Sequence, residues 1–168
     1  MLWLVVVVLG TVVLVVVLVR ALWSFAAAWR KYRLAEANRC EREVPGFGLA
    51  RFDGQGTWSF QIPFGDRTLW AHVSGTKSSP SEFELISLVF ARAHLGILAT
   101  SAFPKLNTVF QEWGVQESAG SAALEGISTY PAQPGPAFGL CFSSAADPDG
   151  MYEVVFSGLT PEMARRDD

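Results

Sequence analysis

The first nineteen residues constrain this chain more than any other feature. From Met1 to Val19 there is no charged residue, and ten of these nineteen residues are valine. As a helix with a rise of ~1.5 Å per residue, Leu2–Val19 covers about 27 Å, close to the hydrocarbon thickness of a bilayer. A helix also satisfies every backbone hydrogen bond internally, as lipid requires. The sequence therefore predicts one N-terminal transmembrane helix.

Aromatic and basic residues flank this run in the pattern of a membrane interface. Trp3 marks its start, and a collar of mixed aromatic and basic residues follows its end. We expect the collar to lie among the lipid headgroups, where long basic side chains reach the interface. The predicted anchor and interface residues are Trp3, Arg20, Trp23, Trp29, Arg30, Lys31, Tyr32 and Arg33.

The basic residues lie on one side of the run only. No Lys or Arg precedes it, and six follow it between Arg20 and Arg42. The positive-inside rule therefore places the N-terminus outside and the C-terminal domain in the cytoplasm, as in a single-pass protein of a bacterial inner or intracytoplasmic membrane. A cleaved signal peptide is the alternative, because Ala26-Ala27-Ala28 resembles a cleavage site. The segment lacks a positive start, however, and its apolar run is longer than usual.

The segment after the anchor favours a longer helix. Ala21–Glu43 contains no glycine or proline and is rich in helix formers, so we expect the helix to continue to Val44-Pro45. The predicted organisation is a transmembrane anchor over 1–29, a basic juxtamembrane helix over 30–45, a small soluble α+β domain over 46–163 and a frayed tail over 164–168.

Two hairpins are predicted in the soluble part. Residues 57–62 alternate polar and apolar, and 67–73 form the return strand after a Pro-Phe-Gly-Asp turn. Residues 48–52 precede a further turn at 53–56 and are a candidate partner strand. The second hairpin joins 138–143 to 152–156 through a turn at 147–150. A short helix is expected to begin at 160–162.

The stretch between the hairpins is ambiguous. Ser79-Pro80 and Glu82 predict a helix start, with apolar residues at helical spacing up to Ile97 and Gly96 as its end. The alternative is a strand over 83–90, because that stretch is apolar in both phases. A second helix candidate covers 103–113. The fold class expected is α+β, with a small antiparallel sheet and one or two helices.

Residues for catalysis are scarce. His72 and His94 are the only histidines, and zinc-binding or nucleophile-elbow spacings are missing. An enzyme would need His72, His94, Asp53 and Cys141 to converge through the fold. We expect no enzyme, metal or cofactor, and two reduced thiols at Cys40 and Cys141. Residues 44–168 carry 7 basic and 13 acidic residues, a net charge of 7 − 13 = −6, which argues against nucleic-acid binding.

These features favour a non-catalytic accessory or structural subunit of a larger membrane protein complex, of a respiratory, photosynthetic or secretory kind. The alternative is a membrane-tethered binding module for a small ligand or a soluble partner. Two residues are candidate partner contacts. Arg20 either reaches the headgroups or faces another membrane subunit, and Trp70 points away from the core side of its strand unless a helix covers that face.

Overall fold

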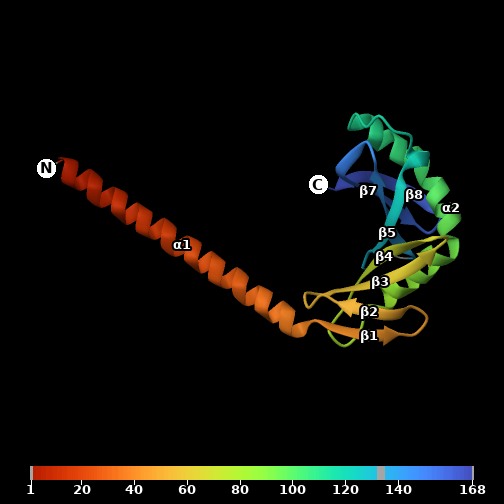
Figure 1. Ribbon diagram of the computed structural model, residues 1–168, viewed down its shortest axis with the longest axis horizontal. Coiled ribbons are helices and arrows are strands. Elements are labelled where there is room, and N and C mark those ends of the chain that lie inside the picture. Colours follow the sequence, from red (N-terminus) through yellow and green to blue (C-terminus); the bar gives the residue numbers. More distant parts are fainter. Residues whose placement is uncertain (1, 132–134, 168) are drawn as a thin grey trace. The chain divides into compact units, whose positions relative to one another are not determined.

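The computed structural model describes residues 2–131 and 135–167, with side chains from Leu14 onward (Figure 1). The chain forms two compact units, Met1–Asn38 and Arg39–Asp168. The first unit is helix α1, Leu2–Asn38. It ends well before Pro45, so the predicted juxtamembrane helix over 30–45 is wrong in its second half, and a sheet follows instead.

Strand β1 (Cys40–Val44) replaces the end of that helix. It pairs antiparallel with β2 (Gly48–Phe52) along its whole length, from Cys40 opposite Phe52 to Val44 opposite Gly48. Val44 is buried as part of the hydrophobic core. The helix propensity of the intervening Glu and Arg residues is a weak preference, and the tertiary pairing overrides it.

The second unit is built on one sheet whose strands follow the sequence order from β1 to β8. All neighbouring pairs are antiparallel except β4 and β5, which are parallel and joined by helix α2 (Glu82–Glu112) and a short 3₁₀ helix (Ala119–Ser121). The described residues therefore form an α+β fold, as predicted. The remaining strands are β3 (Thr57–Phe64), β4 (Arg67–Ser74), β5 (Ala123–Thr129), β6 (Ala137–Ser144), β7 (Asp147–Ser157) and β8 (Thr160–Asp167).

The core lies between α2 and one face of the sheet (Figure 1). The first predicted hairpin is confirmed in β3 and β4, where Trp58 lies opposite Val73 and Ile62 opposite Leu69. Alternate residues of both strands are buried against the helix, as strand geometry requires. The partner strand expected at 48–52 is β2, which pairs with β3 through Arg51 and Phe52.

Helix α2 settles the ambiguity of the central stretch in favour of helix. Its N-cap is Ser81 rather than Ser79. The Ser81 hydroxyl accepts a hydrogen bond from the backbone N–H of Glu84, three residues along, as in a capping box. Gly96 does not end the helix. The second predicted helix over 103–113 is the continuation of α2, and Pro104 lies on its exposed side.

The C-terminal part differs from the prediction in two places. The turn of the second hairpin is at 145–146, and 147–150 already belongs to β7, where Asp147 is opposite Ser144. The helix expected at 160–162 is wrong, because these residues lie in β8, which pairs with β7 from Ser157–Thr160 to Met151–Asp167. Residues 164–167 of the predicted frayed tail lie in the same strand, and Asp168 lies outside the described residues.

Candidate functional site

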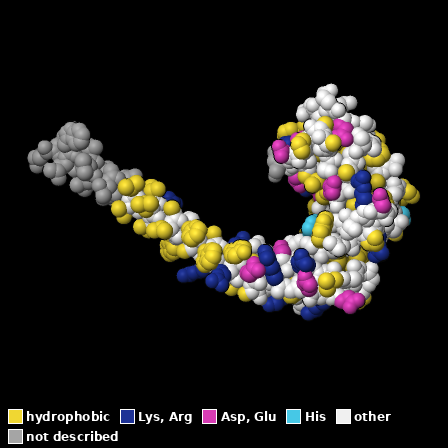
Figure 2. Space-filling view, viewed as in Figure 1, with side chains coloured by type: hydrophobic (Ala, Val, Ile, Leu, Met, Phe, Trp, Pro, Cys, Tyr) yellow, Lys and Arg dark blue, Asp and Glu magenta, His cyan; other side chains and the backbone are white. Residues whose placement is uncertain are grey.

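Helix α1 presents an apolar surface over its described part. Leu14 to Val19 are each 52–60 % exposed within the protein, and Trp23 is 77 % exposed. A soluble protein rarely leaves a continuous large apolar surface uncovered. Figure 2 shows apolar side chains gathered along this helix, with Lys and Arg beside them. The predicted interface residue Trp3 lies outside the described side chains.

The predicted collar residues form a ladder along one side of α1. Trp29 stacks with Phe25 at 6.5 Å and with Tyr32 at 6.0 Å between ring centroids, and Arg33 lies 5.5 Å over the Trp29 ring. These residues are three or four positions apart, the spacing at which helical neighbours meet. Arg20, Arg30 and Lys31 are exposed on the same helix. The ladder has the composition of a bilayer interface.

The face of the sheet opposite α2, here called the far sheet face, carries Trp70. Trp70 is 47 % exposed, and it alternates with the buried Leu69 and Ala71 along β4. Gly126 lies directly opposite Trp70 on β5, and a side chain at 126 would meet the Trp70 backbone. A large aromatic ring on an open strand surface is typical of a contact residue.

The histidines do not form a site. His72 lies on the far sheet face, with its Nδ1 3.1 Å from the Ser59 hydroxyl, whereas His94 lies on α2 against the Phe90 ring on the other side of the sheet. Burial lowers the pKa of His72, and the negative charge of Asp53 partly offsets this. Asp53 accepts from three backbone N–H groups of its turn. Burial alone would raise its pKa, but these donors hold it below its ordinary value.

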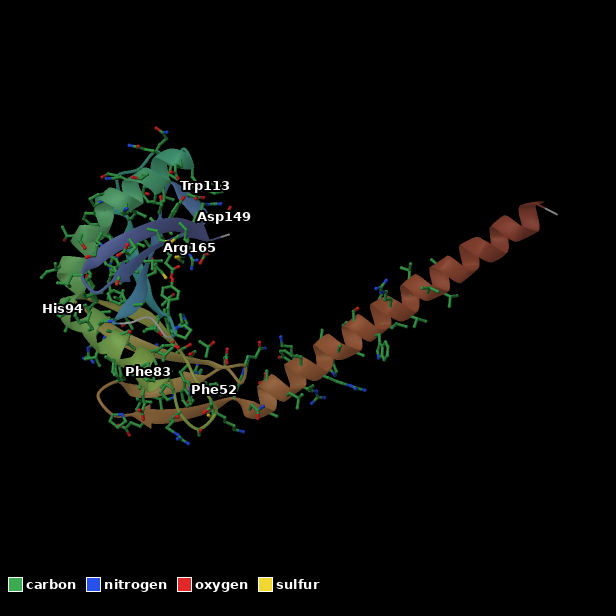
Figure 3. All side chains as sticks on the ribbon, turned by 180° about the vertical axis from the view of Figure 1, so that it is seen from behind. Phe52, Phe83, His94, Trp113, Asp149 and Arg165 are labelled. Atoms are coloured by element: carbon green, nitrogen blue, oxygen red, sulfur yellow. The ribbon has the colours of Figure 1, made fainter. Side chains whose placement is uncertain are left out.

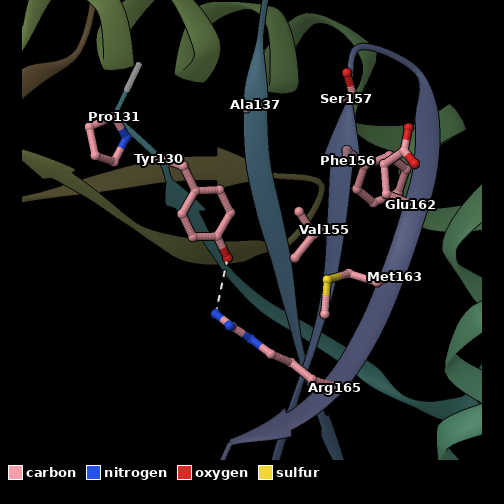
Figure 4. Close-up of a pocket in the computed structure, with 9 residues that line it drawn as sticks. All are labelled: Tyr130, Pro131, Ala137, Val155, Phe156, Ser157, Glu162, Met163 and Arg165. Atoms are coloured by element: carbon pink, nitrogen blue, oxygen red, sulfur yellow. Dashed lines mark hydrogen bonds between the residues drawn. The ribbon is translucent and has the colours of Figure 1, made fainter. Parts of the chain in front are cut away.

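An ion pair with a buried carboxylate and a half-exposed guanidinium occupies the far sheet face near β8. Glu153 of β7 is only 3 % exposed, and its Oε2 accepts from Nε of Arg165 at 2.8 Å and from Nη2 of the same residue. Nη2 of Arg165 also lies 3.4 Å from the Tyr130 hydroxyl (Figure 4). A carboxylate so deeply buried requires a partner charge, and Arg165 supplies it. The pair therefore holds β8 against β7.

Two further groups beside this ion pair are held in their neutral forms. Burial raises the pKa of Tyr130, and its hydrogen bond to Glu153 raises it further. Burial also raises the pKa of Cys141, which lies 3.4 Å from the Ser128 hydroxyl. The thiolate, not the thiol, is the nucleophile, so Cys141 lacks the activation of a catalytic cysteine.

A pocket of about 470 Å³ lies beside the Glu153–Arg165 pair (Figure 4). Its walls are mainly apolar, from Val155, Phe156 and Met163, and the Arg165 guanidinium and Tyr130 ring border it. A volume of this size falls within the range of small-molecule sites. No spacing in the sequence indicates this pocket, because its lining residues come from β6, β7, β8 and the loop before them, which only the fold brings together.

Helix α2 also exposes apolar residues on the side away from the sheet. Phe83 is 79 % exposed, Ile86 62 % and Ile97 66 %, and Figure 3 shows Phe83 at the start of α2. Among the described residues, α2 is the helix long and apolar enough to cross a membrane, by length and composition. Its apolar character has two sources, since one face forms the core and the other is this exposed stripe.

The described residues contain no group of three or more His, Cys, Asp or Glu side chains that could hold a metal ion. Comparison of the chain with protein-family models, with curated proteins and with solved structures found no match. The features that bear on function are therefore α1 with its aromatic ladder, Trp70, the pocket beside Arg165 and the exposed stripe of α2.

Proposed function

We propose that this chain is a non-catalytic, single-pass accessory subunit of a larger membrane protein complex. The observation that carries the proposal is α1, whose large apolar and aromatic side chains are all exposed from Leu14 onward. Lipid and neighbouring membrane helices are the environments that cover such a surface. The uncharged run of Leu2–Val13 extends the same helix by more than three turns.

The orientation follows from the position of the basic residues. The N-terminus lies outside and the α+β unit lies in the cytoplasm, because Arg20 and the Arg and Lys residues near the aromatic ladder follow the uncharged run. A bacterial inner or intracytoplasmic membrane suits this layout. Arg20 then lies at the inner boundary of the bilayer, where it faces headgroups or a partner helix.

Trp70 supports a contact with other subunits. It places a large aromatic ring on the far sheet face, next to the small residue Gly126. Aromatic residues contribute strongly at protein interfaces when a partner buries them. Trp70→Ala should therefore weaken the complex without weakening the fold, because almost half of the side chain is already exposed.

Gentle detergent extraction of the native membrane, followed by sizing and mass spectrometry, tests the proposal. The full chain is expected in a stoichiometric assembly, and Trp70→Ala is expected to reduce that fraction. Leu159→Ala is the matched control, since Leu159 is also about half exposed but lies in the turn between β7 and β8. A chain that elutes alone, near its own mass plus detergent, refutes the accessory role.

The pocket beside Arg165 favours the second candidate function, a tethered binding module. Its apolar walls and one guanidinium suit an amphipathic small molecule with an oxygen acceptor. This function predicts a chain that is free of other subunits and carries a small molecule through purification. Mass spectrometry of the extracted protein under native conditions distinguishes the two functions directly.

A further inference from the structure

The pocket beside the Glu153–Arg165 pair has an apolar middle and a polar group at each end, and it is here called the β7–β8 pocket. Figure 4 shows Arg165 at one end, Met163 in the middle and Glu162 at the other end. The order of these residues along β8 agrees with this layout. At ~3.3 Å per residue, the stretch from Glu162 to Arg165 spans about 10 Å. A ligand that fills the pocket is therefore expected to have an apolar body of about that length.

Glu153 determines how Arg165 can meet a ligand. A guanidinium donates through one N–H on Nε and a pair of N–H groups on each Nη. Oε2 of Glu153 accepts from Nε at 2.8 Å and from Nη2, and the Tyr130 hydroxyl lies 3.4 Å from Nη2. Within the described residues, these contacts of Arg165 leave the N–H groups of Nη1 for a ligand. The Arg165 side chain is 46 % exposed, so a ligand can reach them.

A carboxylate ligand matches this arrangement poorly. Arginine binds carboxylates best through two parallel N–H groups, and the Nε–Nη2 edge of Arg165 already holds Glu153. The charged side chains of the site are Arg165, Glu153 and Glu162, with a net charge of 1 − 2 = −1. An anion would be repelled by this net charge, whereas an uncharged carbonyl oxygen would not.

The walls of the β7–β8 pocket favour an aromatic body for the ligand. Met163 is 50 % exposed, and thioethers make favourable contacts with aromatic rings. The Tyr130 ring borders the pocket from the side opposite Met163 (Figure 4). An aromatic ligand placed between the two would contact a sulfur atom on one side and a ring on the other.

We propose that the β7–β8 pocket binds an uncharged aromatic carbonyl compound. Its carbonyl oxygen accepts from Nη1 of Arg165, and its ring lies between Met163 and Tyr130. A hydroxyl at the far end of the ring donates to the Glu162 carboxylate. Arg165 is the specificity-determining residue, and Glu153 positions it. This inference rests on the second candidate function, the binding module, and names its class of ligand.

Equilibrium dialysis of the full chain, with the same detergent in both compartments, tests the proposal with two probes of nearly equal shape. The first probe is 6-hydroxy-2-acetylnaphthalene, an uncharged ketone. The second is 6-hydroxy-2-naphthoate, in which a carboxylate replaces the acetyl group. At neutral pH the ketone should bind saturably, and the carboxylate should bind about tenfold more weakly. The absence of saturable ketone binding overturns the proposal, and so does equal or tighter binding of the carboxylate.

A substitution that fills the β7–β8 pocket tests the location of the site. Met163→Trp places a larger side chain among the lining residues and should weaken ketone binding about tenfold. Met151→Trp is the matched control, because Met151 is a partly exposed methionine of the same sheet face that lies outside the pocket lining. Equal ketone binding by the two variants places the probe elsewhere and overturns the proposal.

Two charge variants test the basis of the specificity. Arg165→Lys keeps a partner charge for Glu153 but loses the planar guanidinium that reaches both Glu153 and the ligand, so ketone binding should weaken about fivefold. Glu162→Gln removes one negative charge and should narrow the preference for ketone over carboxylate about threefold. Glu112→Gln, an exposed residue at the end of α2, is its control. An unchanged preference in Glu162→Gln overturns the assigned role of charge, even if Arg165→Lys fails to fold.

Native mass spectrometry separates this inference from the binding function on which it rests. A co-purified small molecule that Met163→Trp displaces, together with no binding of the ketone, refutes the ligand class and leaves the binding function intact. A chain that carries no small molecule and binds neither probe refutes both. Neither result bears on the accessory role, which depends on α1 and not on the β7–β8 pocket.

Discussion

Glu84 is a buried carboxylate that connects the start of α2 to the sheet, and its replacement by alanine is expected to weaken the fold strongly. The side chain is 1 % exposed. Its Oε2 accepts from the backbone N–H of Ser74 at 2.7 Å and from the Thr129 hydroxyl at 2.6 Å, and its Oε1 accepts from the Ser74 hydroxyl. One residue thus links α2 to β4 and β5, the parallel pair that α2 connects.

The expected loss for Glu84→Ala is about 3 kcal/mol. The Ser74 N–H becomes an unsatisfied donor, which costs roughly 1–3 kcal/mol. Loss of one buried methylene adds about 0.8 kcal/mol, and loss of a negative charge at the helix N-terminus adds about 0.5 kcal/mol. Thr129 contributes little to this loss, because its hydroxyl also lies 2.9 Å from the His72 carbonyl and retains an acceptor.

Urea unfolding of the full chain in detergent, followed by near-UV circular dichroism, measures this loss. In thermal unfolding, the same loss should lower the melting temperature by about 10 °C for a unit of this size. Glu84→Gln keeps the side-chain volume and one accepting oxygen, so about half of the effect should remain. A double-mutant cycle with Ser74→Ala, which removes the hydroxyl that donates to Oε1 of Glu84, should show a coupling of about 1 kcal/mol. A loss below about 1 kcal/mol with no coupling would refute the assigned role.

Two further predictions concern glycines and acid. Gly139→Ala should destabilise the protein by about 1–3 kcal/mol, because the methyl group would overlap the buried Glu153 carboxylate. Gly96→Ala should stabilise the protein by about 1 kcal/mol, because Gly96 faces open space within a helix. Urea titrations of the two variants measure both changes in the free energy of unfolding. Hydrogen bonds from Arg166 and Tyr152 hold the pKa of Asp147 below its ordinary 3.8. The stabilisation of the fold by the Asp147 carboxylate is therefore complete above pH 3.8 and is lost as the pH falls through the lower pKa of the native state. The Asp147→Asn variant should consequently lose less stability on acidification than the unsubstituted protein.

The elements that the sequence predicted correctly carry their own local signals. The β3–β4 hairpin alternates buried and exposed residues around a glycine turn at Gly65, which has a positive φ of 61°. Helix α2 has a proline and a glutamate near its start and apolar residues at helical spacing, which predicted a helix although not its Ser81 cap or its full length to Glu112. In such segments local propensity and tertiary packing favour the same structure.

The missed strands depend on partners that lie elsewhere in the chain. Residues 40–44 read as helix, and only their pairing with β2 makes them a strand. Strand β8 contains few large apolar residues and ends in charged residues, a composition typical of an edge strand and easily mistaken for a tail. The Glu153–Arg165 pair depends on the β7–β8 register, so no spacing in the sequence could have revealed it.

The two apolar faces of α2 explain why hydropathy alone cannot assign this helix, and they lead to a last prediction. Leu88 and Leu98 are fully buried against the sheet, whereas Ile86 and Ile97 are largely exposed. Ile86→Gln with Ile97→Gln should therefore change the free energy of unfolding by less than about 1 kcal/mol.

Leu88→Gln with Leu98→Gln is the matched control for those substitutions. It makes the same chemical change on the core face and should unfold the domain, because two polar groups would be buried without partners. Urea unfolding of both double variants separates the roles of the two faces. If the two isoleucine substitutions also unfold the protein, the outer face of α2 belongs to the structural core and not to the exposed surface.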